Sequence, residues 1–336
     1  MAASNRFSAT ALVALAAGTL GLSAVAVAQA AAIDPAAIWT AQWENASISS
    51  GAITDRLYTN GLRLGWTSPT DDVPAAVRSL GQSLYGDGQQ RLIFGLLQQI
   101  YTPVATQLRV PPPTDRPYAA ILMGSVGLVQ DSANVRNQIV VGLGMIGPAA
   151  LGGPVQNGFH DVIGQGHNLG WPHQIANEPL AELTASRTWR FPLGQFGQWE
   201  TDALPNLTVG FGNLRLYGQG GMTMRLGQGL NTDFGVARVL PGMSGGDAYL
   251  PADFAWYVFL GADGQAVARD ITLDGSDMVA GPSVTHKPWL GEAQAGFAVM
   301  GYGMRLSYTH IVQTQQFQRQ KGGLHQLGSL ALSAKF

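Results

Sequence analysis

The segment "TNGLRLGWT", residues 59–67, alternates between two kinds of side chain from Gly61 onward. The apolar residues Leu62, Leu64 and Trp66 share one set of alternating positions, and Thr59, Gly61, Arg63, Gly65 and Thr67, which are polar or small, share the other. A period of two places each set on one face of a β-strand. The same alternation recurs in residues 217–227, 303–309 and 327–336. The pattern predicts an all-β chain.

Composition indicates where these strands lie. The 336 residues are 46% hydrophobic but only 12% charged, whereas soluble domains carry about a quarter charged residues. This favours membrane strands, and the alternative that alternation alone leaves open is a soluble β-sandwich. A net charge of −2 offers no basic surface for nucleic acid. The absence of cysteine excludes disulfides and thiolate metal sites.

Charged residues on one face of the strands favour a closed barrel. Arg63, Arg225, Arg305 and Lys335 alternate with apolar neighbours, and such side chains are tolerated in a membrane strand only when they face a wet interior. Open sheet edges do not survive in hydrocarbon because their backbone groups stay unpaired. We therefore predict a transmembrane antiparallel β-barrel.

Strand counting leaves one ambiguity. Thirteen segments have strand character: 37–48, 57–68, 89–102, 117–129, 136–147, 178–191, 203–212, 214–227, 254–263, 266–274, 291–301, 302–313 and 325–336. Bacterial single-chain barrels use an even number of strands. We therefore expect about twelve, with one segment not a strand or two segments forming one strand.

The N-terminal 30 residues have the features of a secretory signal peptide. Arg6 precedes an apolar stretch that ends in Ala28-Gln29-Ala30, with small residues at both positions of an export cleavage site. Cleavage after Ala30 leaves residues 31–336 as a single outer-membrane β-barrel domain. After Ala30 no apolar run reaches the roughly 18 residues of a spanning helix. The predicted location is the cell outer membrane.

Polar residues gather in the loops at one end of the predicted barrel. If the chain starts on the periplasmic side, the connections that follow the first, third and fifth strands all emerge on the outer side. Hairpin connectivity alone then brings six residues to one rim, namely Asn45, Thr59, Arg109, Arg116, Gln156 and His160. We also expect a short helix in the extracellular loop near 153–170.

The chain resembles the outer-membrane lipid A 3′-O-deacylases, calcium-dependent twelve-stranded barrels that remove acyl chains from lipopolysaccharide. The resemblance rests on segments spread in order over most of the chain: "DRLYTNGLRLGW", "IYTP", "TDRPYA", "IGPAALGGPVQNGFH", "QIANEP" and "VARDITLDG". It implies His160 as the catalytic general base. It further implies a calcium site at Asn45, Thr59 and Gln156, and substrate contacts from Arg109 and Arg116. The partners implied are lipid A and outer-membrane lipid, for a monomeric enzyme.

The predicted chemistry is ester hydrolysis without a serine nucleophile. A neutral imidazole can activate water, and a hard cation can polarise the ester carbonyl. The sequence departs from the family at Ala46, where an acidic residue is expected, and Asp55 or Asp161 is a candidate replacement. Because calcium affinity follows ligand charge, this departure leaves activity in doubt. Two alternatives therefore stay open: a catalytically inactive barrel with a structural or binding role, and a small porin.

Overall fold

A computed structural model describes residues 33–50, 56–239 and 246–336. Thirteen strands in these residues form one antiparallel sheet. The strands are β1 (Ile38–Asn45), β2 (Leu57–Thr67), β3 (Gln89–Thr102), β4 (Ala119–Asp131), β5 (Val135–Ile146), β6 (Glu178–Trp189), β7 (Phe191–Phe196), β8 (Trp199–Gly212), β9 (Arg215–Gln228), β10 (Phe254–Asp270), β11 (Trp289–Gly301), β12 (Met304–Gln313) and β13 (His325–Lys335).

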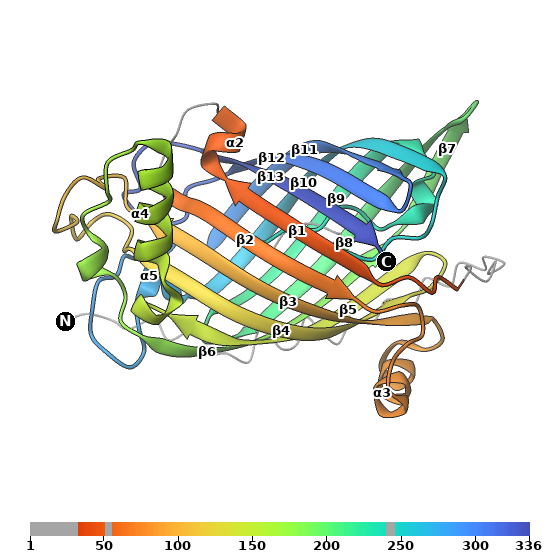
Figure 1. Ribbon diagram of the computed structural model, residues 1–336, viewed down its shortest axis with the longest axis horizontal. Coiled ribbons are helices and arrows are strands. Elements are labelled where there is room, and N and C mark those ends of the chain that lie inside the picture. Colours follow the sequence, from red (N-terminus) through yellow and green to blue (C-terminus); the bar gives the residue numbers. More distant parts are fainter. Residues whose placement is uncertain (1–32, 51–55, 240–245) are drawn as a thin grey trace.

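The sheet closes into a twelve-stranded barrel, as predicted. Neighbouring strands pair in sequence order, β1 pairs with β13, and β6 pairs directly with β8. The short strand β7 stands outside this cylinder, because it pairs only with the first part of β8. It forms a hairpin that projects beyond one end of the barrel (Figure 1).

The extra segment in the sequence-based strand list comes from one strand that was divided in two. Segments 254–263 and 266–274 are the single strand β10, whose pairing with β11 runs without a break through Asp263 and Gly264. The Asp-Gly pair is typical of a turn, but here Asp263 is buried, and the strand simply continues. The last four residues of the second segment form the short helix α5 (Ile271–Asp274), which Asp270 caps by accepting a hydrogen bond from Thr272 N.

The helices divide between the two ends of the barrel (Figure 1). One end carries α2 (Ala46–Ser50), α4 (Gly152–Ile163) and α5, and we call it the outer end because long loops are extracellular in such barrels. The opposite, inner end carries β7, the last residue Phe336 and α3 (Ala75–Tyr85). Short 3₁₀ helices span Pro148–Ala150, Trp171–His173 and Leu230–Thr232. The helix expected near 153–170 is confirmed by α4.

Helices do not contribute membrane spans in the described part of the chain, since none there is long and apolar enough to cross a bilayer. The predicted signal peptide and its cleavage site after Ala30 lie outside the described residues.

A loop folds into the barrel lumen and contacts the inner faces of the strands. This plug, residues 229–239 and 246–253 as described, connects β9 to β10 and folds back between the strands. Arg63 on β2 forms an ion pair of 2.6 Å with Asp247 of the plug, and Gln42 Nε2 donates to the carbonyl of Ala237 at 2.8 Å. The predicted wet face of the strands is therefore confirmed as an interior face, and its charges are paired.

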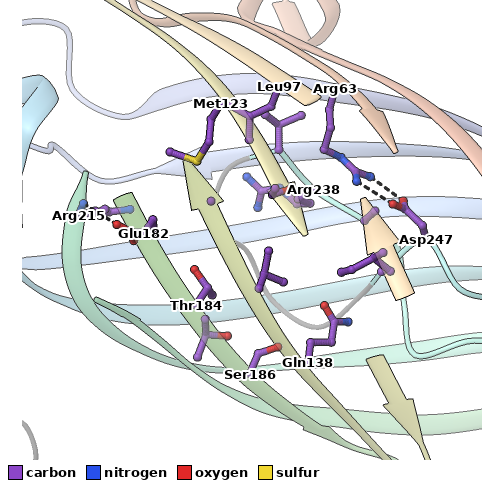
Figure 2. A pocket seen from close by; sticks show the side chains of 18 of the residues that line it. Arg63, Leu97, Met123, Gln138, Glu182, Thr184, Ser186, Arg215, Arg238 and Asp247 are labelled. Carbon is purple, nitrogen blue, oxygen red and sulfur yellow. Dashed lines mark hydrogen bonds and ion pairs between the residues drawn. The ribbon is translucent and has the colours of Figure 1, made fainter. Parts of the chain in front are cut away.

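A cavity of about 310 Å³ lies inside the barrel beside the plug. Its wall carries both signs of charge, and Figure 2 shows Glu182 and Arg215 side by side on one wall with the Arg63–Asp247 pair on another. Threonine, serine and glutamine side chains line much of the remainder, including Thr184, Ser186 and Gln138. The lining also has a large apolar part, to which Leu97 and Met123 contribute, and the cavity lies on the lumen side of the wall.

Candidate active site on the outer wall

The loop that carries the predicted base packs on the lipid-facing side of the barrel. Ile100 on β3 and Ala120 on β4 occupy the same alternating register as the exposed Leu96 and Val126, so their side chains point outward. Both are nevertheless fully buried. They form one cluster with Tyr118, Ala150 and Trp171. The connection between β5 and β6 therefore covers the outer ends of β3 and β4.

Helix α4 presents one face to this wall. Its buried residues are Gly152, Gly153, Gln156 and His160, which share one side because helical neighbours recur every three to four residues. Gly152 permits the close approach, because a Cβ added there would stand 2.4 Å from the Ala120 Cβ. The helix ends at Gly164, whose φ of 70° is the left-handed conformation that glycine adopts at helix ends.

The imidazole of His160 is buried and oriented. Only 3% of the residue is exposed. Its Nδ1 lies 2.8 Å from the carbonyl oxygen of Gly166. A carbonyl oxygen can only accept, so Nδ1 carries a proton, and in a neutral imidazole the lone pair is then on Nε2. This is the tautomer that a general base requires at Nε2.

Gln156 lies one turn before His160 and is held by a tryptophan. The indole Nε1 of Trp171 donates to Gln156 Oε1 at 3.0 Å, which assigns the oxygen end of the amide. The other end, Nε2, is buried and has no hydrogen-bond partner among the described residues. An amide N–H buried in this way is available to donate to a bound molecule.

The first hairpin contributes its polar residues to the same side of the wall. Asn45 Nδ2 donates to Asn60 Oδ1 at 3.3 Å, and Asn60 stands opposite the buried Ile100 on β3. Thr59 sits at a bulge of β2, with its hydroxyl 2.7 Å from the hydroxyl of Thr102. The contacts run from Asn45 through Asn60 and Ile100 to the cluster that holds α4.

The two predicted substrate arginines lie in different surroundings. Arg109 is exposed on the loop between β3 and β4, and this loop adjoins the segment after α4, since Leu169 N donates to Thr106 O. Arg116 is only 1% exposed and donates to Gln316 and Thr272, with its guanidinium 4.2 Å above the ring of Tyr101. The structure thus keeps the loop of Arg109 beside the segment that follows α4, whereas Arg116 joins three outer loops from the lumen side.

The donor set at the outer wall does not by itself fit a calcium ion. Asn45, Thr59 and Gln156 offer only neutral oxygens, and Asn45 Oδ1 already accepts from both the amide and the hydroxyl of Ser47. Within the described residues there is no cluster of three acidic or histidine side chains. Asp161 is exposed and bonded to His167, and Asp55 lies outside the described residues. Calcium in proteins is usually held by carboxylates.

Two residues that support the site were not predicted. Gln98 lies in the outward register of β3 and donates to the carbonyl of Ala150, just before α4. Asn60 lies in the outward register of β2 and accepts from the Trp43 indole at 2.8 Å. A polar residue in a register that otherwise carries leucine and aromatic side chains is the signal that would have identified both.

Comparison with known proteins agrees with this architecture. Residues 12–336 match the model of the family described as outer membrane protein LpxR. The chain belongs to the LpxR family. None of the curated proteins matches it by sequence. Membership of the LpxR family places the chain in the outer membrane and supports a lipid A deacylase, as the resemblance implied.

Solved structures show the same fold. The chain is similar to LpxR from Salmonella typhimurium, with a TM-score of 0.73 and 21% identity over 89% of this chain and 100% of that one. It also matches the β domain of the Bordetella autotransporter BrkA, with a TM-score of 0.46 and 11% identity over 90% of this chain and all of that one. The likeness to the Salmonella protein, at 21% identity, establishes the barrel and not the chemistry.

Proposed function

We propose that this LpxR-family barrel is a lipid A 3′-O-deacylase that hydrolyses an ester-linked acyl chain of lipopolysaccharide. The observation that carries the proposal is the position of His160: a buried imidazole with Nδ1 bonded to Gly166 O, on the lipid-facing side of the outer end. A site there adjoins the membrane surface, where the ester bonds of a membrane lipid lie. The exposed Arg109 on the adjoining loop is suited to an anionic substrate.

The reaction uses water as the nucleophile. Nε2 of His160 takes a proton from a water molecule, and the water oxygen attacks the ester carbonyl carbon. Nε2 of Gln156 donates to the carbonyl oxygen as negative charge develops there. Collapse of the tetrahedral intermediate breaks the bond to the sugar oxygen, which receives the proton from the imidazolium. The products are a free fatty acid and lipid A with a hydroxyl at the former ester.

Mass spectrometry of lipid A from expressing cells tests this reaction. Cells with the wild-type chain should lose an ester-linked acyl chain, and cells with His160→Ala should not. His167→Ala is the matched control, because His167 lies in the same loop but is exposed and bonded only to Asp161. Unchanged lipid A with folded wild-type protein, or wild-type turnover in His160→Ala, would overturn the proposal.

Calcium dependence stays a separate prediction. The resemblance implies an ion at Asn45, Thr59 and Gln156, but these neutral oxygens would bind it weakly. We therefore expect activity to require a high calcium concentration, and Ala46→Asp to lower that requirement. Titration of calcium into chelated membranes measures both. Activity that is indifferent to chelation in both proteins would exclude the metal site.

The two alternatives make different predictions. An inactive barrel would leave lipid A intact at every calcium concentration, and Ala46→Asp would then show whether the missing carboxylate is the cause. A porin would conduct ions, but the plug and its paired charges obstruct the lumen. We therefore expect no conductance from the wild-type chain in planar bilayers.

A further inference from the structure

Helix α3 is attached to the lipid-facing side of the barrel at the inner end. Gln90 Nε2 on β3 donates to the carbonyl of Arg78 in the helix, and Gln130 Nε2 on β4 donates to the carbonyl of Gly86 just after it. Gly81 lies directly on the wall, because a Cβ added there would stand 2.9 Å from Leu128 Cδ2. All three wall residues belong to the outward register of their strands, so the helix is bound to the outside of the cylinder.

The outward residues beneath α3 show the depth at which it lies. A row of large outward side chains crosses β1 to β3, with Trp39 opposite Trp66 and Trp66 opposite Phe94. Aromatic residues in such a row mark the boundary between hydrocarbon and headgroups. One step of two residues further toward the inner end, roughly 7 Å on, is the pair Leu92 and Leu128.

The next step brings the pair Gln90 and Gln130. The outward register therefore changes from apolar to polar where α3 is attached. The helix lies at the edge of the apolar belt rather than in the aqueous space beyond it. It projects sideways from the barrel at this level (Figure 1).

One side of α3 is apolar and uncovered. Leu80 and Leu84 are 52% and 50% exposed and stand one turn apart, with the exposed Ala76 a further turn before them. Leu80 is about 100° around the helix from Gly81, so the barrel wall does not cover it. The helix has no acidic residue, and its one arginine, Arg78, is bonded to the carbonyl of Asp71.

We propose that α3 is an interfacial anchor whose apolar side enters the phospholipid surface of the inner leaflet. The apolar stripe continues the lipid-facing belt of β3 and β4 at the depth where that belt ends, which identifies the occupant as lipid. Short amphipathic helices bind in this way, with the apolar face among the upper acyl chains and the polar face in water. The anchor resists tilting of the barrel and is independent of the chemistry at His160.

Single labels on α3 test the proposal, because the chain has no cysteine of its own. Leu84→Cys carries a fluorophore on the apolar side, and Gln82→Cys carries it on the polar side of the same turn. The proteins are reconstituted in phosphatidylethanolamine–phosphatidylglycerol vesicles, and iodide quenching from water is compared with quenching by a nitroxide-labelled lipid. Leu80→Cys serves as a second apolar site if Leu84→Cys does not fold.

The expected result is quenching by iodide about fivefold weaker at position 84 than at position 82, with the reverse order for the lipid quencher. Equal iodide quenching at both positions would overturn the anchor. Protection that grows with the protein-to-lipid ratio, and is absent at low ratio, would instead indicate a second copy of the chain on this face and would also overturn it.

Discussion

Asp233 is the residue whose loss should open the barrel. Its carboxylate lies at the base of the plug, fully buried, 2.6 Å from Arg225 Nη1 and 3.1 Å from Arg305 Nη1. It also accepts from the Tyr257 hydroxyl at 2.9 Å and from the amide of Gly235 at 3.0 Å. Asp233→Ala leaves two buried guanidiniums without this shared partner. Breaking a buried ion pair from one side destabilises by about 3–5 kcal/mol, and we expect a loss of that size.

The same carboxylate gives a pH dependence. Burial alone would raise the pKa of Asp233, but Arg225 and Arg305 outweigh it and hold the pKa below its ordinary value. A lowered folded-state pKa means that the stabilisation is complete above the ordinary value near 4 and is lost as pH falls below it. Wild-type plug stability should therefore be constant from pH 7 to about 5 and fall below about 4.

Two measurements check this prediction. Unfolding by guanidinium in phospholipid bilayers, followed by tryptophan fluorescence, measures the free energy of unfolding, and planar-bilayer recording measures conductance. Asp253→Ala is the matched control, because Asp253 is an exposed carboxylate at the end of the same loop. We expect Asp233→Ala to conduct and the control to stay closed. A stability within about 1 kcal/mol of wild type, together with a closed channel, would refute the role assigned to the ion pairs.

The other predictions concern the outer loops. Gly152→Ala should displace the start of α4 and reduce deacylation at least tenfold. Gly158→Ala is the control: its added Cβ meets no atom within 4 Å, so it should stabilise the helix by up to about 1 kcal/mol and keep activity. Equal activities of the two variants would contradict the close packing at Gly152. The hydrogen bond that His286 Nδ1 donates to Asp274 Oδ1 raises the pKa of His286. This contact therefore stabilises the loop between β10 and β11 below about pH 6.5 and weakens as pH rises through the raised value. Amide hydrogen exchange in residues 271–288 should be slower at pH 6 than at pH 8 after correction for intrinsic rates, and His286→Gln should remove that difference.

Alternation predicted the barrel because each side chain of a barrel strand faces either the lipid or the lumen, and its polarity follows from that environment. The resulting alternation in polarity lies within one strand, so it can be recognised without knowing which strands are neighbours. It did not reveal that β10 runs through Asp263 and Gly264, because an Asp-Gly pair has the same local chemistry in a turn and in a lumen-facing strand. Pairing with β9 and β11 on both sides decides the matter, and those contacts come from distant parts of the chain.

For the rim residues, the sequence predicted at which end of the barrel they lie but not on which side of the wall. Connectivity brought Asn45, Gln156, Arg109 and Arg116 to the outer end, but it could not tell which side of the wall each would face. Arg116 points inward to Thr272 and Gln316, while Gln156 faces the outer wall. The difference depends on how two loops fold back on the sheet, and alternation ends where the strands end.

The His160 imidazole lies outside the barrel wall, and the limited space in the lumen explains why. A plug and paired charges occupy much of the lumen, and the cavity of about 310 Å³ beside them is far too small for a lipid with several acyl chains. A membrane lipid reaches the outer wall by lateral diffusion alone, so a base at that surface needs no entry path through the protein. Gln98 and Asn60, polar residues in lipid-facing registers, are tolerated there because they hold the loop between β5 and β6 and the first hairpin. Leucine at either position should leave the barrel closed and loosen only the attachment of the site.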